Sequence, residues 1–131
     1  MKKYQLKSND ANSTLAFGVL CDEKEYKISW LINEEFGIEL ALSSNIQWTN
    51  KKLPTIIEFT CYKDEVSNTE PIMLIRSKTS EGHALLEFGQ FDYLLIVGKS
   101  DKDWKGNLRK IREIRGVFEL DASSLSDIEL L

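Results

Sequence analysis

The pattern of apolar and polar positions predicts a strand followed by a helix near the start of the chain. Residues 15–21 (LAFGVLC) form an apolar run of strand length, in which Gly18 indicates a bulge or a close approach of another group to the backbone. Residues 23–36 then show apolar positions at helical spacing. Asp22 and Glu25 have the spacing of an N-terminal capping box, so we expect the helix to begin there.

This predicted helix, which Gly37 should end, carries apolar residues on two sides. The usual core-facing stripe is formed by Ile28, Leu31, Ile32 and Phe36. Tyr26 and Trp30 form an i, i+4 pair that projects from roughly the opposite side. A helix packed on a sheet needs to bury only one side. The second side should therefore be covered by a terminal segment, covered by another chain, or left exposed.

The rest of the chain predicts further strands and one more helix. Apolar runs of strand length or period occur at 38–42, 46–48, 57–61, 72–77, 91–97 and 117–121. A second helix is expected over 103–115, with Trp104, Leu108, Ile111 and Ile114 on one side. Arg115 falls in the same arc, so it must reach solvent or meet a carboxylate.

These elements predict a single α+β domain over residues 1–131. The middle strands follow one another through short turns rather than through helical crossovers. This favours a mainly antiparallel sheet of about five to seven strands with two principal helices. Residues 1–14 are polar and are expected to be frayed or an edge strand, and 123–131 would be a flexible tail or a short docking helix.

Composition and charge restrict the class of protein. The 131 residues are 42% hydrophobic and 29% charged, with a formal net charge of −4, which excludes a disordered polyanion and an overall basic nucleic-acid binder. No run approaches the roughly 18–20 apolar residues of a membrane span, and residues 1–14 lack the apolar core of a signal peptide. Cys21 and Cys61 lie in strand-like runs and are expected as buried, reduced thiols. We therefore expect a cytoplasmic protein.

Few residues in the chain carry metal-binding or catalytic chemistry. A zinc site needs three or four ligands, whereas the chain has one histidine, His83, and two widely separated cysteines. The motifs of phosphate-binding loops, dinucleotide-binding folds and hydrolase nucleophile elbows do not occur in the sequence. We therefore expect no metal and no cofactor, we assign no catalytic residue, and we favour a non-catalytic protein over an enzyme.

Two carboxylates flank an apolar run and are candidates for a buried role. They are Glu87 and Asp92, whereas the acidic pairs 34–35 and 64–65 are expected on the surface. A buried carboxylate needs a cationic partner, and the available ones are Arg76, Arg112 and Arg115. A structural contact between a carboxylate and an arginine is favoured over acid–base catalysis.

The strongest charge feature is the segment 99–115, which holds seven basic and three acidic residues. Within it, Lys105, Arg109 and Lys110 are the candidate basic surface for phosphate contacts. No aromatic residues interleave with these three as stacking platforms. A solvated helix face is therefore favoured over nucleic-acid binding.

Two segments resemble a known family. Residues 26–33 (YKISWLIN) are similar to a Y-x-[LI]-x-W-x-[LI]-N helix, and residues 85–93 (LLEFGQFDY) are similar to I-P-E-x-x-x-V-D-Y. The chain thus resembles the IPExxxVDY family of small bacterial proteins. Glu87, Asp92 and Tyr93 match the motif, while Leu86 stands in place of its proline. The resemblance implies a bacterial cytosolic setting, and it implies no activity, cofactor or catalytic residue. We interpret the motif as structural, a turn that positions the following strand.

Three functions remain open from the sequence. The first is a non-catalytic protein-interaction or self-associating module, a homodimer or a complex with a protein partner, through Tyr26 and Trp30. The second is a small-ligand-binding protein or an enzyme with a site near Glu81–Tyr93, where Glu87 or Asp92 would lie beside His83 or an arginine. The third is RNA binding through the basic helix 103–115, which is the least favoured.

Overall fold

The computed structural model describes residues 4–5, 14–43, 45–50, 53–65, 72–77, 90–98, 102–120 and 129–130. They form an α+β fold with a main antiparallel sheet in the strand order β3-β6-β7-β8-β2-β9. The strands of this sheet are β2 (Thr14–Cys21), β3 (Ala41–Leu42), β6 (Cys61–Asp64), β7 (Ile72–Arg76), β8 (Tyr93–Gly98) and β9 (Ile114–Leu120). The predicted fold class is therefore confirmed.

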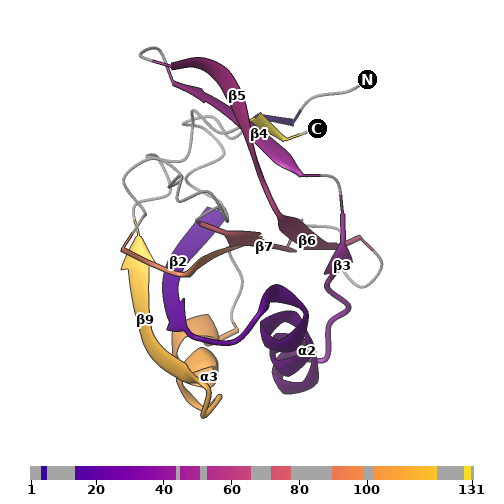
Figure 1. Ribbon diagram of the computed structural model, residues 1–131. Coiled ribbons are helices and arrows are strands. Elements are labelled where there is room, and N and C mark those ends of the chain that lie inside the picture. The colour runs from indigo at the N-terminus through magenta and orange to yellow at the C-terminus, as the bar shows by residue number, and fades with distance from the viewer. Residues whose placement is uncertain are drawn as a thin grey trace.

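A second, four-stranded sheet, which the sequence did not predict, has the order β1-β10-β4-β5. Its strands are β1 (Tyr4–Gln5), β4 (Ile46–Asn50), β5 (Leu53–Phe59) and β10 (Glu129–Leu130). It brings the two terminal strands together beside the β4–β5 hairpin, at the opposite end of the molecule from the helices (Figure 1).

Both helices, α2 (Glu25–Phe36) and α3 (Trp104–Arg109), lie on one face of the main sheet (Figure 1). They contact each other through Phe36 and Trp104, whose rings stack with centroids 4.3 Å apart. The Lys102 ammonium group lies 5.2 Å from the centroid of the Trp104 ring, where the negative face of the ring attracts a cation.

The central strands are buried on both faces, as their nearly continuous apolar sequences indicate. Leu95 of β8 faces the helix side and packs in a cluster with Ile28 and Ile32 of α2. Its neighbours Leu94 and Ile96 face the other side and belong to a second cluster that includes residues of the β4–β5 sheet. Every apolar residue of 72–75 and 93–97 is buried. The expectation of two interior strands is thus confirmed, with bounds of 72–76 and 93–98 in place of 72–77 and 91–97.

The start of α2 differs from the predicted capping box. The helix begins at Glu25, and its N-cap is Lys24, whose side chain makes no capping hydrogen bond to the described helix. Asp22 lies two residues further back and instead pairs with Arg115, with 3.1 Å between Oδ1 and Nη2. The end of the helix is as predicted, because Gly37 adopts the left-handed conformation, with φ 65°, and donates its N–H to the Asn33 carbonyl.

The second helix is much shorter than predicted. It ends at Arg109, a turn follows, and Ile114 already belongs to β9, where it pairs with Cys21 of β2. The four apolar residues expected on one side of the helix are nevertheless all buried, namely Trp104, Leu108, Ile111 and Ile114. Their spacing identified the core-facing positions but could not distinguish a long helix from a short helix, a turn and a strand.

Three further predictions are corrected. The apolar run 57–61 is divided at Thr60 between β5 and β6, which belong to different sheets. Asp64, expected on the surface, is buried and accepts a hydrogen bond from the Glu39 backbone N–H, with 3.0 Å between the heavy atoms. In the tail, Glu129–Leu130 form a strand rather than part of a docking helix, and residues 123–128 lie outside the described residues.

Gly18 is a close-approach position, as the sequence suggested. A Cβ atom at this site would lie 2.6 Å from Cγ of the Phe91 ring, far inside normal contact distance. The irregularity in the pairing of β2 with β9 falls later, between Leu20 and Cys21. Glycine is thus required here by the ring that covers it rather than by a bulge.

We expect Gly18→Ala to destabilise the protein by about 1–3 kcal/mol, because the added methyl group overpacks the core against Phe91. Urea unfolding would measure the change. The same substitution in a Phe91→Leu background should cost clearly less, because the ring plane that excludes the methyl group is gone. An equal cost in both backgrounds would contradict the packing explanation.

Candidate functional site

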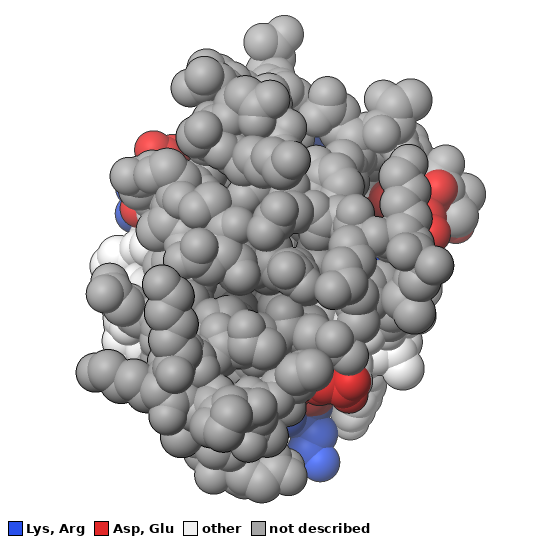
Figure 2. Space-filling model, turned by 90° about the horizontal axis from the view of Figure 1, so that it is seen from above, with Lys and Arg blue, Asp and Glu red and all other residues white. Residues whose placement is uncertain are grey.

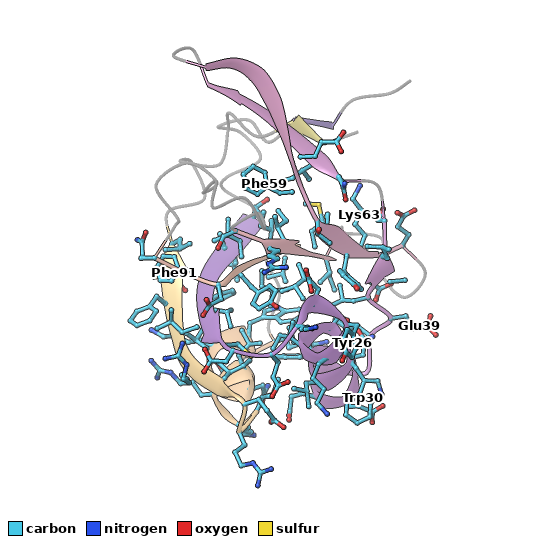
Figure 3. All side chains as sticks on the ribbon, in the orientation of Figure 1. Tyr26, Trp30, Glu39, Phe59, Lys63 and Phe91 are labelled. Carbon is cyan, nitrogen blue, oxygen red and sulfur yellow. The ribbon has the colours of Figure 1, made fainter. Side chains whose placement is uncertain are left out.

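Two surface features of the described residues are candidates for function, and both involve α2. The first is the α2 aromatic face, formed by Tyr26 and Trp30. These side chains are 68% and 53% exposed, whereas Ile28 and Ile32 on the other side of the helix are fully buried. Both project from the side of α2 that is turned away from the sheet (Figure 3). The second apolar side predicted for this helix is therefore left open.

The α2 aromatic face is bordered by charged groups. The Lys27 ammonium group lies 5.2 Å from the centroid of the Trp30 ring, which is a cation–π contact. Glu34 is exposed one turn after Trp30, at i+4. A partner surface would thus meet two aromatic rings with a cation on one side and a carboxylate on the other.

The second feature is a cleft of about 520 Å³ at one end of the main sheet. It lies where β2 and β7 end, where β8 begins, and where the chain turns into α2. Its lining residues are Cys21, Asp22, Glu23, Lys24, Glu25, Arg76, Asp92 and Tyr93. The volume is within the range of small-molecule sites, although the lining is dominated by charged side chains.

Asp92 joins two strands at the base of the cleft. Its backbone N–H donates to the Val19 carbonyl, and its carboxylate Oδ2 accepts the Cys21 backbone N–H at 2.8 Å. The pairing of β2 with β8 ends at Val19 and Tyr93, so the carboxylate provides the acceptor that the strand no longer supplies. The same oxygen lies 3.7 Å from Nη2 of Arg115, which also meets Asp22. Arg115 therefore meets carboxylates, one of the two outcomes expected for it.

Tyr93 fixes the segment that leads into α2. Its ring is buried in the core, and its hydroxyl donates a hydrogen bond to the Glu23 carbonyl. Burial raises the pKa of the Tyr93 hydroxyl, with the nearby Glu25 carboxylate adding to the effect. The hydroxyl is thus a neutral donor at physiological pH. Tyr93 thus has a buried ring and a hydrogen-bonded hydroxyl, as the sequence predicts.

An ion pair closes one side of the cleft. Nη1 of Arg76 lies 2.7 Å from Oε1 of Glu25 in the first turn of α2. Burial acts to raise the pKa of Glu25, but hydrogen bonds from its own backbone N–H and from Arg76 outweigh burial, so the pKa is lowered. Glu25 therefore remains ionised and paired, and it ties the start of α2 to the end of β7.

Both cysteines are buried free thiols, as predicted. Cys21 lines the cleft, and burial raises the pKa of its thiol. Burial raises the pKa of Cys61 further, to about 12. Since the thiolate is the reactive form, neither group has the character of a catalytic nucleophile.

The sequence-predicted site residues are only partly brought together. Asp92 and Tyr93 meet at the cleft, but Glu81, His83 and Glu87 lie outside the described residues. The residues that complete the cleft, 22–25 and Arg76, were not predicted as a site. The only sign of them in the sequence is their charge. They lie close together because strands that are distant in the sequence pair in the main sheet.

The candidate basic surface does not lie along one helix. Lys105 and Arg109 are in α3, whereas Lys110 follows its end, and Lys105 is half-buried. On the face seen from above, which is opposite the helices, a few described basic side chains are visible at the rim, next to acidic ones (Figure 2). The expectation of a basic helix over 103–115 is thus wrong in its length, since α3 has six residues.

Comparisons with protein-family models, with curated proteins and with solved structures found no match. Within the described residues there is no group of three or more His, Cys, Asp or Glu side chains placed to hold a metal ion. Among the same residues, neither helix has the length and apolar character needed to cross a membrane.

Asp92→Ala should destabilise the protein by about 1–3 kcal/mol, because the partly buried Cys21 N–H loses its acceptor. Asp92→Asn keeps an acceptor oxygen and should cost less. Denaturant unfolding of the two variants would measure the difference. Asp22→Ala is the control, with an expected effect of about 0–1 kcal/mol, because the Asp22–Arg115 pair is exposed. Equal losses for Asp92→Ala and Asp92→Asn would contradict this role.

Proposed function

We propose that this chain is a non-catalytic protein-interaction module that docks through the α2 aromatic face. The observation that carries the proposal is the exposure of Tyr26 and Trp30, at 68% and 53%, on a helix whose other side fills the core. The buried face already accounts for the stability of α2, so folding alone does not require two aromatic rings outside.

Tyrosine and tryptophan are the residue types that contribute most to protein–protein binding. Removing their large apolar surfaces from water is favourable, and their polar edges can still find hydrogen-bond partners. Tyr26 and Trp30 are one helical turn apart, so both rings can enter the same partner surface. A polar rim is also in place in the exposed Lys24 and Glu34 and the partly exposed Lys27.

The resemblance to the IPExxxVDY family, with its bacterial cytosolic setting, also remains a proposal. It is carried by the sequence of 26–33 and by the motif positions Asp92 and Tyr93. The contacts of these two residues with the Cys21 N–H and the Glu23 carbonyl support a structural role for the motif. A structural motif fits an interaction module, since it orients α2 without supplying chemistry.

Association of the purified protein, with itself or with a protein partner, should weaken at least tenfold when Tyr26 and Trp30 are both changed to Ser. Each such aromatic anchor contributes about 2 kcal/mol or more. Sedimentation velocity up to about 1 mM and titration with any recovered partner would measure the change. Phe118→Ser and Leu42→Ser alter exposed apolar residues outside α2 and should have little effect. Association that survives the double substitution unchanged, or no association at all, would overturn the proposal.

A second candidate function is the binding of a small polar molecule in the cleft. The specific observation is a cavity of about 520 Å³ whose lining includes Asp92 and Arg76. Arg76 is 44% exposed at its side chain while paired with Glu25, so a ligand anion could exchange for the carboxylate.

Titrating a set of charged metabolites into labelled protein should yield a compound that shifts the amide NMR signals of Cys21, Glu25 and Asp92 together. Arg76→Met should then weaken its binding at least tenfold, because a hydrogen bond to a charged group contributes about 1.5–3 kcal/mol. Arg109→Met, at an exposed arginine of α3, is the control. A set without such a compound, or binding indifferent to Arg76→Met, would dispose of this second function.

A further inference from the structure

We infer that the occupant of the α2 aromatic face is a second copy of this chain, with the two α2 helices packed antiparallel. This inference rests on the proposed function and names its partner. It follows from the order of charges along the exposed side of α2, which is self-complementary when two such helices run in opposite directions.

The charges of α2 are arranged against the helix dipole. Lys24 and Lys27 lie at its N-terminal end, Glu34 and Glu35 lie at its C-terminal end, and its last turn holds no basic residue. A helix favours the opposite order, because its N-terminus carries partial positive charge and its C-terminus partial negative charge. Glu25 fits that preference but is engaged with Arg76 in the cleft. Within the chain, the Lys102 ammonium group lies 5.7 Å from the centroid of the Phe36 ring in the last turn and offsets part of this order. The remaining charges on the exposed side of α2 favour a partner that presents the opposite order.

An antiparallel second copy presents this opposite order. Lys27, Trp30 and Glu34 follow one another at spacings of three and four, so they lie on one stripe of the helix. A two-fold axis passing near Trp30 places the two Trp30 rings together. In this arrangement Lys27 lies opposite position 33 of the second helix, one residue before Glu34. The offset between Lys27 and that Glu34 along the helix axis is therefore roughly 1.5 Å. Each helix end then meets the opposite charge and the opposite end of the other dipole.

The size of the apolar patch indicates how much surface the two aromatic side chains contribute to the association. A buried aromatic side chain removes about 150–250 Å² from water, so Tyr26 and Trp30 at their observed exposures contribute about 500 Å² over both copies. A stable interface buries about 1,200–2,000 Å². The two aromatic side chains alone thus supply less than half of the area of a stable interface, so we expect a reversible pairing that weakens as salt screens the lysine–glutamate pairs.

Charge reversal tests the antiparallel arrangement. Lys27→Glu and Glu34→Lys should each raise the dissociation constant of the homodimer at least tenfold, because each replaces two attractive contacts with two repulsive ones. An equimolar mixture of the two variants should restore association to within about threefold of the unchanged chain, since both contacts in the mixed dimer again join opposite charges. Sedimentation equilibrium would measure the homodimers, and energy transfer between labelled chains would measure the mixed dimer.

Misfolding does not explain a loss in these variants, because both changes suit the isolated helix. Lys27→Glu places an acidic residue in the first turn, and Glu34→Lys places a basic one near the last. Thermal unfolding should therefore show variants at least as stable as the unchanged chain. Arg109→Glu and Glu119→Lys make the same charge changes at exposed positions outside α2, and both should leave the dissociation constant within about twofold.

The outcomes separate this inference from the proposed function. Weaker self-association of each variant, together with restored association in the mixture, supports the antiparallel dimer. Variants that associate like the unchanged chain, or a mixture without recovery, overturn it. A monomeric chain that binds a different, purified protein only when Tyr26 and Trp30 are present overturns this inference and leaves the proposed function standing. No association of any kind that depends on those two residues overturns both.

Discussion

The hydrogen bond between the Asp92 carboxylate and the Cys21 backbone N–H is the contact on which the two candidate surfaces depend. It holds the end of β2 against the start of β8, at the point where backbone pairing between these strands stops. The Tyr93 hydroxyl then holds the Glu23 carbonyl, and Arg76 holds Glu25. Three successive contacts thus hold the segment that leads into α2, and the burial of Ile28 and Ile32 sets which side of the helix faces outward. A rotation of α2 by half a turn would bury Trp30 and expose Ile32.

The features predicted from sequence are those that local pattern determines. The apolar runs at 72–77 and 91–97 could be buried only as interior strands, and Gly37 ended the helix through its left-handed conformation. The two-sided distribution of apolar residues on α2 was also visible, because helical spacing alone assigns Tyr26 and Ile28 to opposite sides. The contacts of Asp92 and Tyr93 followed from the general rule that buried polar groups are hydrogen-bonded.

The features that sequence did not predict depend on contacts between distant segments. Asp22 has the spacing of a helix cap, but Arg115, 93 residues further along the chain, takes its carboxylate. The expected long helix at 103–115 is interrupted because Ile114 pairs with Cys21 of β2. The sequence predicts Asp64 on the surface, but it is buried because the Glu39 backbone N–H donates a hydrogen bond to its carboxylate. The cleft belongs to the same class, since its lining comes from three separate segments of the chain.

The burial of both cysteines has a practical consequence for studying the molecule. Cys21 and Cys61 are the two cysteines of the whole chain, and each is 2% exposed or less with a raised thiol pKa. Thiol-directed probes react with accessible thiolates, so we expect them to label the two native cysteines of the folded chain very little. A cysteine introduced at an exposed position such as Glu35 would accordingly accept a spin label or fluorophore selectively. Native Cys21 and Cys61 can stay in place, and the core that they help to fill is left intact.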